Sequence, residues 1–212
     1  MIAPEGKIIL VPVVLLLVAG ILLLYFFQIP TLKLVNIGLI LFATFCFYFF
    51  RDPVRISTGN NNQFVSPADG KIVQIKEIED TDFGKAQQIS IFLSVFNVHR
   101  QRVPLSATVI YSKYNKGKYL AAFNHKASLD NEQTEILFDS GKGKKYKIKQ
   151  IAGLIARRII NYMKPKMEVE RGDNLGFIRF GSRVDILVPL NFKIGVTLGQ
   201  KVIGGETIIG EF

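Results

Sequence analysis

The chain has 212 residues, 49% of them hydrophobic, and a formal net charge of +10 at pH 7. Cys46 is its only cysteine, which excludes an intrachain disulfide and a cysteine-based metal site. With only two histidines besides, a zinc centre is not expected, and we predict no bound metal. The first fifty residues carry little charge, so the rest forms a basic surface that favours nucleic acid or acidic phospholipid.

Two apolar runs open the chain. Residues 8–27 are twenty uncharged positions, and as a helix they reach about 30 Å, enough to span a hydrocarbon core. A second run follows at 34–50, after the polar segment 28–33. We predict a transmembrane helical hairpin that anchors the chain over residues 1–50. A cleaved signal peptide fits poorly, because the first run is too long and a second follows directly. A hairpin lying within one leaflet is the alternative that the sequence leaves open.

Basic residues flank the predicted hairpin on its two outer ends. Lys7 precedes the first run, and Arg51 and Arg55 follow the second, whereas the connecting loop contains only Lys33. The positive-inside rule therefore places both ends, and the following domain, on the cytoplasmic side of the cell (inner) membrane. A basic domain tied to a bilayer meets lipid headgroups, so we expect phospholipid rather than nucleic acid as its partner.

From about residue 64 the hydrophobic pattern alternates with period two. Short segments rich in β-branched residues predict strands, and they read "KIVQIKEI", "QISIFLSVF", "SATVIYS", "TEILFDS", "KYKIKQIAG" and "RVDILVPL". Turn signals separate them, and glycines punctuate the C-terminal stretch. "QIAGLIARRIINYM" suggests a strand leading into a short helix. We predict a mostly β domain over 51–212, a small barrel or sandwich with short helices.

Three short polar clusters interrupt the apolar strands: "SPADG" at 66–70, "FNVHRQRVP" at 96–104 and "FGSR" at 180–183. Each has a plain structural explanation, because Asp-Gly is a common turn and a lone histidine is usually a packed or surface residue. Together they supply an aspartate, a histidine and a serine, the residue types of a nucleophile–base–orienter set. Spacing alone does not show that the three meet.

Several co-linear segments carry a resemblance to a known family: "FFRDPVR", "SPADGKIVQI", "FLSVFNVHRQRVP", "NHKASLDNEQTEILF", "KIKQIAGLIARRI" and "GFIRFGSRVDILVP". From about residue 49 onward the chain resembles the short form of the phosphatidylserine decarboxylase proenzyme. The resemblance implies an enzyme, a carboxy-lyase that converts phosphatidylserine to phosphatidylethanolamine and CO2. The glycine-punctuated C-terminal half of the chain resembles the barrel-sandwich fold of lipoyl and biotinyl carriers.

The resemblance also implies self-cleavage between Gly181 and Ser182. The products are a large chain, 1–181, and a small chain, 182–212, which stay together as a heterodimer with or without further oligomerisation. Ser182 becomes a covalent pyruvoyl group, which binds the substrate amine as a Schiff base. No other cofactor is expected, neither a metal nor pyridoxal phosphate.

The supporting roles implied by the resemblance fall on Asp69 and His99. Asp69 orients the imidazole, and His99 takes the proton of Ser182. Long-form members carry two histidines where this chain has "HRQRVP", so the second position is Arg102 here. Either His99 serves both self-cleavage and decarboxylation, or His125 in "NHKAS" contributes.

A serine phospholipid headgroup carries a phosphate and a carboxylate, so cationic side chains are expected to bind it. The candidates are Arg102, Arg157, Arg158 and Arg183. Two other functions stay open. One is decarboxylation of another serine-headed lipid, such as the archaeal-type ether lipid archaetidylserine. The other is a non-catalytic, membrane-anchored lipid-binding β module, which predicts no chain cleavage.

Overall fold

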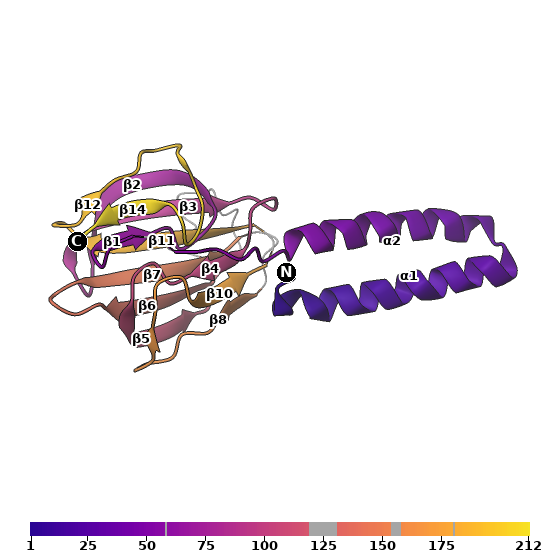
Figure 1. The fold of residues 1–212 in the computed structure, drawn as a ribbon, viewed down its shortest axis with the longest axis horizontal. Coiled ribbons are helices and arrows are strands. Elements are labelled where there is room, and N and C mark those ends of the chain that lie inside the picture. Colours follow the sequence, from indigo (N-terminus) through magenta and orange to yellow (C-terminus); the bar gives the residue numbers. More distant parts are fainter. Residues whose placement is uncertain (58, 119–130, 154–157, 180) are drawn as a thin grey trace. The chain divides into compact units, whose positions relative to one another are not determined.

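The computed structural model describes residues 1–57, 59–118, 131–153, 158–179 and 181–212 (Figure 1). The chain divides into two compact units, Met1–Val54 and Arg55–Phe212.

The first unit contains a short 3-10 helix, Pro4–Gly6, and two long helices, α1 (Lys7–Phe27) and α2 (Pro30–Phe49), which lie side by side in Figure 1. Both are long and apolar enough to cross a membrane, as predicted. The second helix begins four residues earlier than the sequence pattern indicated. Proline suits the first turn of a helix, where its missing N–H has no partner to lose, so the turn shrinks to residues 28 and 29.

The two long helices approach closely at a glycine. A Cβ atom added to Gly20 of α1 would lie 2.2 Å from the Oδ1 atom of Asn36 in α2, and Asn36 is buried. Small residues let membrane helices pack at short distance. Gly20 therefore permits the contact that pairs the two helices around Asn36.

The second unit is built from strands, which confirms the mostly β prediction. They are β1 (Gln63–Val65), β2 (Gly70–Asp80), β3 (Gly84–Leu93), β4 (Arg100–Arg102), β5 (Ala107–Asn115), β6 (Gln133–Asp139), β7 (Lys145–Ala152), β8 (Ile159–Asn161), β9 (Glu168–Val169), β10 (Asn174–Ile178), β11 (Ser182–Pro189), β12 (Lys193–Ile194), β13 (Lys201–Val202) and β14 (Ile208–Glu211). Among the described residues of this unit there is no helix, and residues 159–161 of the predicted short helix form β8 instead.

An eight-stranded antiparallel sheet dominates the second unit, with the order β13-β2-β3-β11-β7-β6-β5-β9. It curls into a half-barrel (Figure 1). Two three-stranded sheets accompany it, with the orders β1-β14-β12 and β4-β10-β8. β11 pairs with β3 along its whole length and with β7 along most of it, so residue 182 starts a strand in the middle of the large sheet.

Side chains alternate across β11, as the period of a strand requires. Val184, Ile186 and Val188 enter the hydrophobic core. Arg183 and Asp185 therefore face the other side of the sheet, where they are also buried. The side chain of Ser182 falls on the core face.

Candidate active site

Gly181 and Ser182 stand where a loop enters β11. Gly181 has a φ of +70°, a left-handed conformation that costs other residues roughly 1–2 kcal/mol. Among the described atoms, none lies within 4 Å of the position a Cβ would take. The glycine is thus required by the backbone conformation and not by lack of space. Ser182 follows it at once, paired with Leu93 of β3 and Ala152 of β7.

The hydroxyl of Ser182 is buried and unpartnered. The residue has 0% exposure, and in the described part of the chain its Oγ atom has no hydrogen-bond partner. Burying a hydroxyl without a partner costs roughly 1–3 kcal/mol, and such atoms in a native fold call for an explanation. One explanation that fits is that this hydroxyl is a nucleophile, kept free of competing hydrogen bonds.

The imidazole of His99 lies beside Gly181. Its Nδ1 atom lies 2.9 Å from the carbonyl oxygen of Asn97, and its Nε2 atom lies 3.3 Å from the backbone nitrogen of Gly181. A carbonyl only accepts and a backbone N–H only donates, so Nδ1 carries the proton and Nε2 presents its lone pair. The basic nitrogen of a neutral imidazole is therefore directed at the Gly181–Ser182 segment.

Two glutamines hold the backbone of His99 in place. Gln101 donates from Nε2 to the His99 carbonyl oxygen at 2.6 Å, and Gln150 donates to Gln101 Oε1 at 3.0 Å. The ring of Phe177 lies 6.3 Å from the imidazole, centre to centre. No motif in the sequence indicates this support. Gln101 stands two residues after His99 in the sequence, but nothing local points to Gln150, which lies 49 residues after Gln101.

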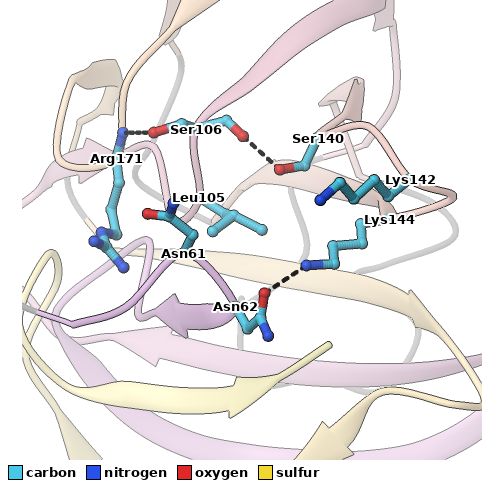
Figure 2. A pocket seen from close by; sticks show the side chains of 8 residues that line it. All are labelled: Asn61, Asn62, Leu105, Ser106, Ser140, Lys142, Lys144 and Arg171. Atoms are coloured by element: carbon cyan, nitrogen blue, oxygen red, sulfur yellow. Dashed lines mark hydrogen bonds between the residues drawn. The ribbon is translucent and has the colours of Figure 1, made fainter.

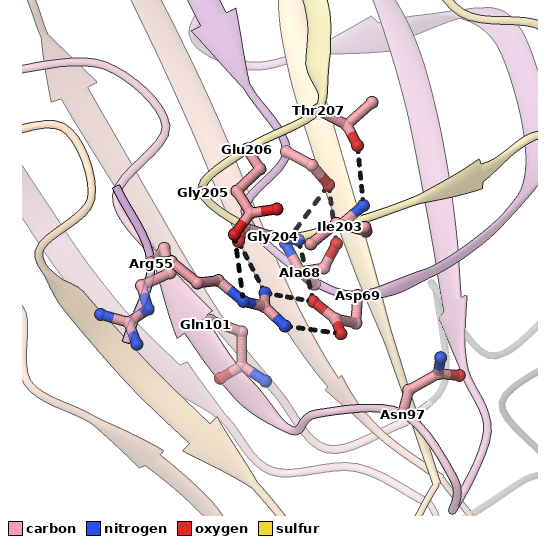
Figure 3. Close-up of polar contacts among 12 residues, drawn as sticks. Arg55, Ala68, Asp69, Asn97, Gln101, Ile203, Gly204, Gly205, Glu206 and Thr207 are labelled. Carbon is pink, nitrogen blue, oxygen red and sulfur yellow. Dashed lines mark hydrogen bonds and ion pairs between the residues drawn. The ribbon is translucent and has the colours of Figure 1, made fainter. Parts of the chain in front are cut away.

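Asp69 lies in a second polar cluster, drawn in Figure 3. Arg55 binds both of its carboxylate oxygens, Nη1 to Oδ1 and Nη2 to Oδ2, the latter at 2.8 Å. Gly204 donates its backbone N–H to Oδ1 at 2.9 Å, and its carbonyl accepts from Arg55 at 2.6 Å. The fork of Arg55 thus joins the Asp69 turn to the loop before β14.

The expected contact between Asp69 and His99 is not formed. Arg55 and Gly204 occupy the carboxylate of Asp69, and the carbonyl of Asn97 takes the proton on His99 Nδ1. The orienting role expected of the aspartate therefore falls to a backbone carbonyl in this structure. A catalytic role for Asp69 itself stays a prediction.

The four arginines expected to bind substrate lie in different surroundings. The Arg183 side chain is 1% exposed and held by an ion pair, which does not fit a substrate-binding role. Arg102 is half-buried and donates to the Gly172 carbonyl at 3.3 Å, and Arg158 is exposed directly before β8. Arg157 and the alternative base His125 lie outside the described residues.

A cavity of about 440 Å³ lies away from these groups (Figure 2). It is lined by Asn61, Asn62, Leu105, Ser106, Ser140, Lys142, Lys144 and Arg171. The strand register puts the β6–β7 turn at the Pro189 end of β11, opposite Ser182. The polar side chains that line the cavity connect loops to one another. Lys144 donates to Asn62 Oδ1 at 2.6 Å, and Arg171 donates to the Asn60 carbonyl at 2.7 Å. We assign this cavity no part in the chemistry.

Another buried charge, Lys147, shares the sheet face of Arg183. Its Nζ atom lies 2.7 Å from both carboxylate oxygens of Asp80 and also pairs with Asp82, which accepts a hydrogen bond from Tyr111. Burial lowers the pKa of Lys147, but hydrogen bonds to the two aspartates outweigh it and raise the pKa above its usual value. Burial and the bond to Asp82 raise the pKa of Tyr111 to about 12. No metal-binding group of three or more histidine, cysteine or acidic side chains occurs among the described residues.

Comparison with known proteins identifies the family. A model of the phosphatidylserine decarboxylase family matches residues 42–210. The chain belongs to this family. Among its relatives are phosphatidylserine decarboxylase proenzymes of Cytophaga hutchinsonii, 45% identical over 77% of this chain and 76% of the relative, and of the Wolbachia of Brugia malayi, 48% identical over 77% and 74%. A proenzyme of the same name from Geobacter sp. strain M21 is 43% identical over 79% and 77%.

Membership of the phosphatidylserine decarboxylase family confirms the resemblance seen in the sequence and the class of enzyme, a carboxy-lyase. The word proenzyme in the relatives' names describes a precursor that is processed. Enzymes of this family use a pyruvoyl group made from a serine of their own chain. Ser182, with a buried hydroxyl free of hydrogen bonds next to a left-handed glycine, fits the formation of that group.

Proposed function

We propose that this chain cleaves itself between Gly181 and Ser182 and then converts phosphatidylserine to phosphatidylethanolamine and CO2. The observation that carries the proposal is the geometry of that bond. Gly181 is held in a left-handed conformation, its N–H is bound by His99 Nε2, and the hydroxyl of Ser182 is buried beside it without a partner. Family membership supplies the substrate.

Self-cleavage begins with attack of Ser182 Oγ on the carbonyl carbon of Gly181. For this step His99 Nε2 exchanges the N–H of Gly181 for the hydroxyl of Ser182. It accepts the hydroxyl proton and returns it to the Ser182 nitrogen as the C–N bond breaks, which leaves an ester. Loss of the Cα proton of residue 182 then breaks its Cβ–Oγ bond. The oxygen leaves with Gly181 as a carboxylate, and one water molecule converts the remaining enamine to a ketone with release of ammonia. The products are chains 1–181 and 182–212.

The pyruvoyl group supplies a carbonyl that accepts the electron pair left when CO2 departs. The residues around it determine access and proton transfer. His99 is anchored by the Asn97 carbonyl and Gln101, both in the large chain, so we expect it to keep its place beside the cleavage site after the bond is cut. We assign it both proton-transfer roles, with His125 as the alternative. Arg102, Arg157 and Arg158 remain the proposed ligands of the headgroup.

The two chains are proposed to stay together as a heterodimer. β11 of the small chain lies between β3 and β7 of the large chain, β13 pairs with β2, and β14 pairs with β1. Cleavage before residue 182 removes none of these pairings. Further oligomerisation is not needed for this association.

The membrane is the proposed location, with the two long helices crossing it as a hairpin. The basic residues Lys7, Arg51 and Arg55 flank the outer ends of the helices, and Lys33 alone carries a charge near the connecting turn. By the positive-inside rule the catalytic domain faces the cytoplasm, at the inner membrane. This side of the bilayer also presents the anionic lipids that a basic domain attracts.

Mass spectrometry of the purified full-length protein tests the proposal. We expect one species for residues 1–181 and one for 182–212 whose first residue is a pyruvoyl group. Ser182→Ala should stay intact and inactive, whereas the control Ser140→Ala, at the opposite end of the sheet, should be processed normally. An active sample made only of intact chain would refute self-processing. The release of CO2 from vesicles of phosphatidylserine or of a serine-headed ether lipid identifies the substrate. A chain that binds both kinds of vesicle without releasing CO2 is a lipid-binding module.

A further inference from the structure

The residue directly after Ser182 has an unusual environment. Arg183 is almost completely buried, and its guanidinium makes three polar contacts. Nε donates to Asp185 Oδ1 at 2.6 Å, and Nη2 donates to Gln74 Oε1 at 2.9 Å and to Ser90 Oγ at 2.7 Å. A long cationic side chain is thus enclosed on the face of the sheet opposite the hydrophobic core.

The contacts tie Arg183 to three adjacent strands. Gln74 belongs to β2, Ser90 to β3 and Asp185 to β11 itself. Gln88 of β3 extends the cluster, because its Nε2 atom donates to Asp185 Oδ2 and to Ser90 Oγ, both at 3.0 Å. We call these five residues, Gln74, Gln88, Ser90, Arg183 and Asp185, the Arg183 cluster.

Stability alone gives a weak reason for such a cluster. A buried ion pair loses roughly as much through desolvation as it gains by attraction, and apolar residues of similar size often replace it without loss. The cluster instead fixes the orientation of one side chain. The planar fork of an arginine held at several points fixes the side chain, and with it the backbone from which it projects.

That backbone becomes important when the chain is cut. Before cleavage, residue 182 is held by covalent bonds on both sides. Afterwards it is the first residue of a chain, and its only covalent link is the amide to the nitrogen of Arg183. Chain ends fray unless they are tied down. In the intact chain, residue 182 pairs with Leu93 and Ala152. After its nitrogen has left as ammonia, only its backbone carbonyl can still accept a hydrogen bond from these neighbours, so further restraint has to act through Arg183.

We propose that the Arg183 cluster positions the pyruvoyl end of the small chain after cleavage. Arg183 is then a positioning residue that touches neither substrate nor the reacting atoms. This inference rests on the proposed function, because it requires cleavage at Gly181–Ser182. It replaces the substrate-binding role that the sequence suggested for this arginine.

The test compares the double variant Arg183→Met/Asp185→Leu with the parent protein. The change removes both members of the ion pair, so no lone charge is left buried. Chain cleavage should proceed, kcat should fall about tenfold or more, and KM for phosphatidylserine should stay within about twofold, because small displacements of a reacting group cost large factors in rate. A matched control, Lys147→Met/Asp80→Leu, removes another buried ion pair of this sheet far from residue 182 and should leave kcat within about twofold.

Hydrogen exchange supplies a readout that does not depend on activity. Amides of residues 183–186 should exchange about tenfold faster in the processed double variant than in the processed parent. In a Ser182→Ala background, where the chain stays continuous, the same double variant should exchange nearly as slowly as its parent. Should the double variant fail to fold, Ser90→Ala removes one contact of the fork and should show the same dependence on cleavage, with a smaller change.

Three results would overturn the inference. Exchange that rises equally with and without cleavage would make the cluster merely structural. A raised KM with unchanged kcat would restore Arg183 as a substrate ligand. Native kcat and native exchange in the processed variants would leave the cluster without a role. An uncleaved parent protein is a different outcome, because it refutes the proposed function itself.

Discussion

Replacing Arg55 by alanine should destabilise the second unit through Asp69. The two side chains are 8% and 12% exposed, and the pair is bidentate. Without the guanidinium, the N–H of Gly204 is the one donor that the carboxylate keeps among the described residues. Removing one partner of a buried pair typically costs roughly 3–5 kcal/mol, and residual exposure puts this case at the lower end, about 3 kcal/mol. For a domain of this size that corresponds to a fall of about 6–12 °C in Tm.

Thermal unfolding followed by circular dichroism measures this cost. The full chain is studied in detergent micelles and in a Ser182→Ala background, so that unfolding involves a single intact chain. Arg158→Ala removes an exposed arginine and should change stability by less than about 0.5 kcal/mol.

A double-mutant cycle identifies the source of the loss. If the unpaired carboxylate is the cause, Arg55→Ala and Asp69→Asn together should cost less than the sum of the two single variants, by about 1–3 kcal/mol. Additive losses, or an Arg55→Ala protein as stable as its parent, would refute the reasoning.

Two further predictions concern other parts of the chain. Gly20→Leu should separate the paired helices, because a side chain there collides with Asn36. At Gly38 no described atom lies within 4 Å of the position a Cβ would take, so Gly38→Leu should be tolerated. Protease protection of the hairpin in micelles compares the two variants. Stability should also decline in alkali. Folding raises the pKa of Tyr111 to about 12 and also raises the pKa of Lys147 above its usual value, so both contributions are complete below about pH 10. The contribution of Tyr111 is lost as pH rises through about 12, and that of Lys147 at still higher pH. Tyr111→Phe should lessen the fall in Tm between about pH 10 and about pH 12. A fall as large as that of the parent protein would contradict the assignment of this pH dependence to Tyr111.

Local pattern was enough to predict the long strands of the second unit. The period-two segments at 71–78 and 183–190 correspond closely to β2 and β11, because alternation records which side chains face the core. The second apolar helix was placed four residues late. Pro30 was interpreted as part of a turn, whereas proline is also favoured in the first turn of a helix.

The candidate site was only partly predictable, since its contacts join distant segments. Ser182 and His99 came from motifs carried by the family resemblance. Arg55 pairs with Asp69 across 14 residues, and no local pattern distinguishes it from a membrane-flanking charge. Asn97 acts through its carbonyl, which every residue possesses, so its side chain gave no signal. Arg183 appeared to be a free cation because the sequence does not show that Gln74, Ser90 and Asp185 surround it.

The position of β11 explains how a protein can cut its own chain and keep its fold. In the proposed reaction one peptide bond is lost at the start of a strand that β3 and β7 flank on both sides. A cut within an edge strand or an exposed loop would leave an end free to move, and a reactive ketone there would be poorly placed. A cut at the start of a central strand leaves the end buried and flanked. Such a site requires a glycine that can turn into the strand and a following residue that anchors it, and Gly181 and Arg183 meet these requirements on either side of Ser182.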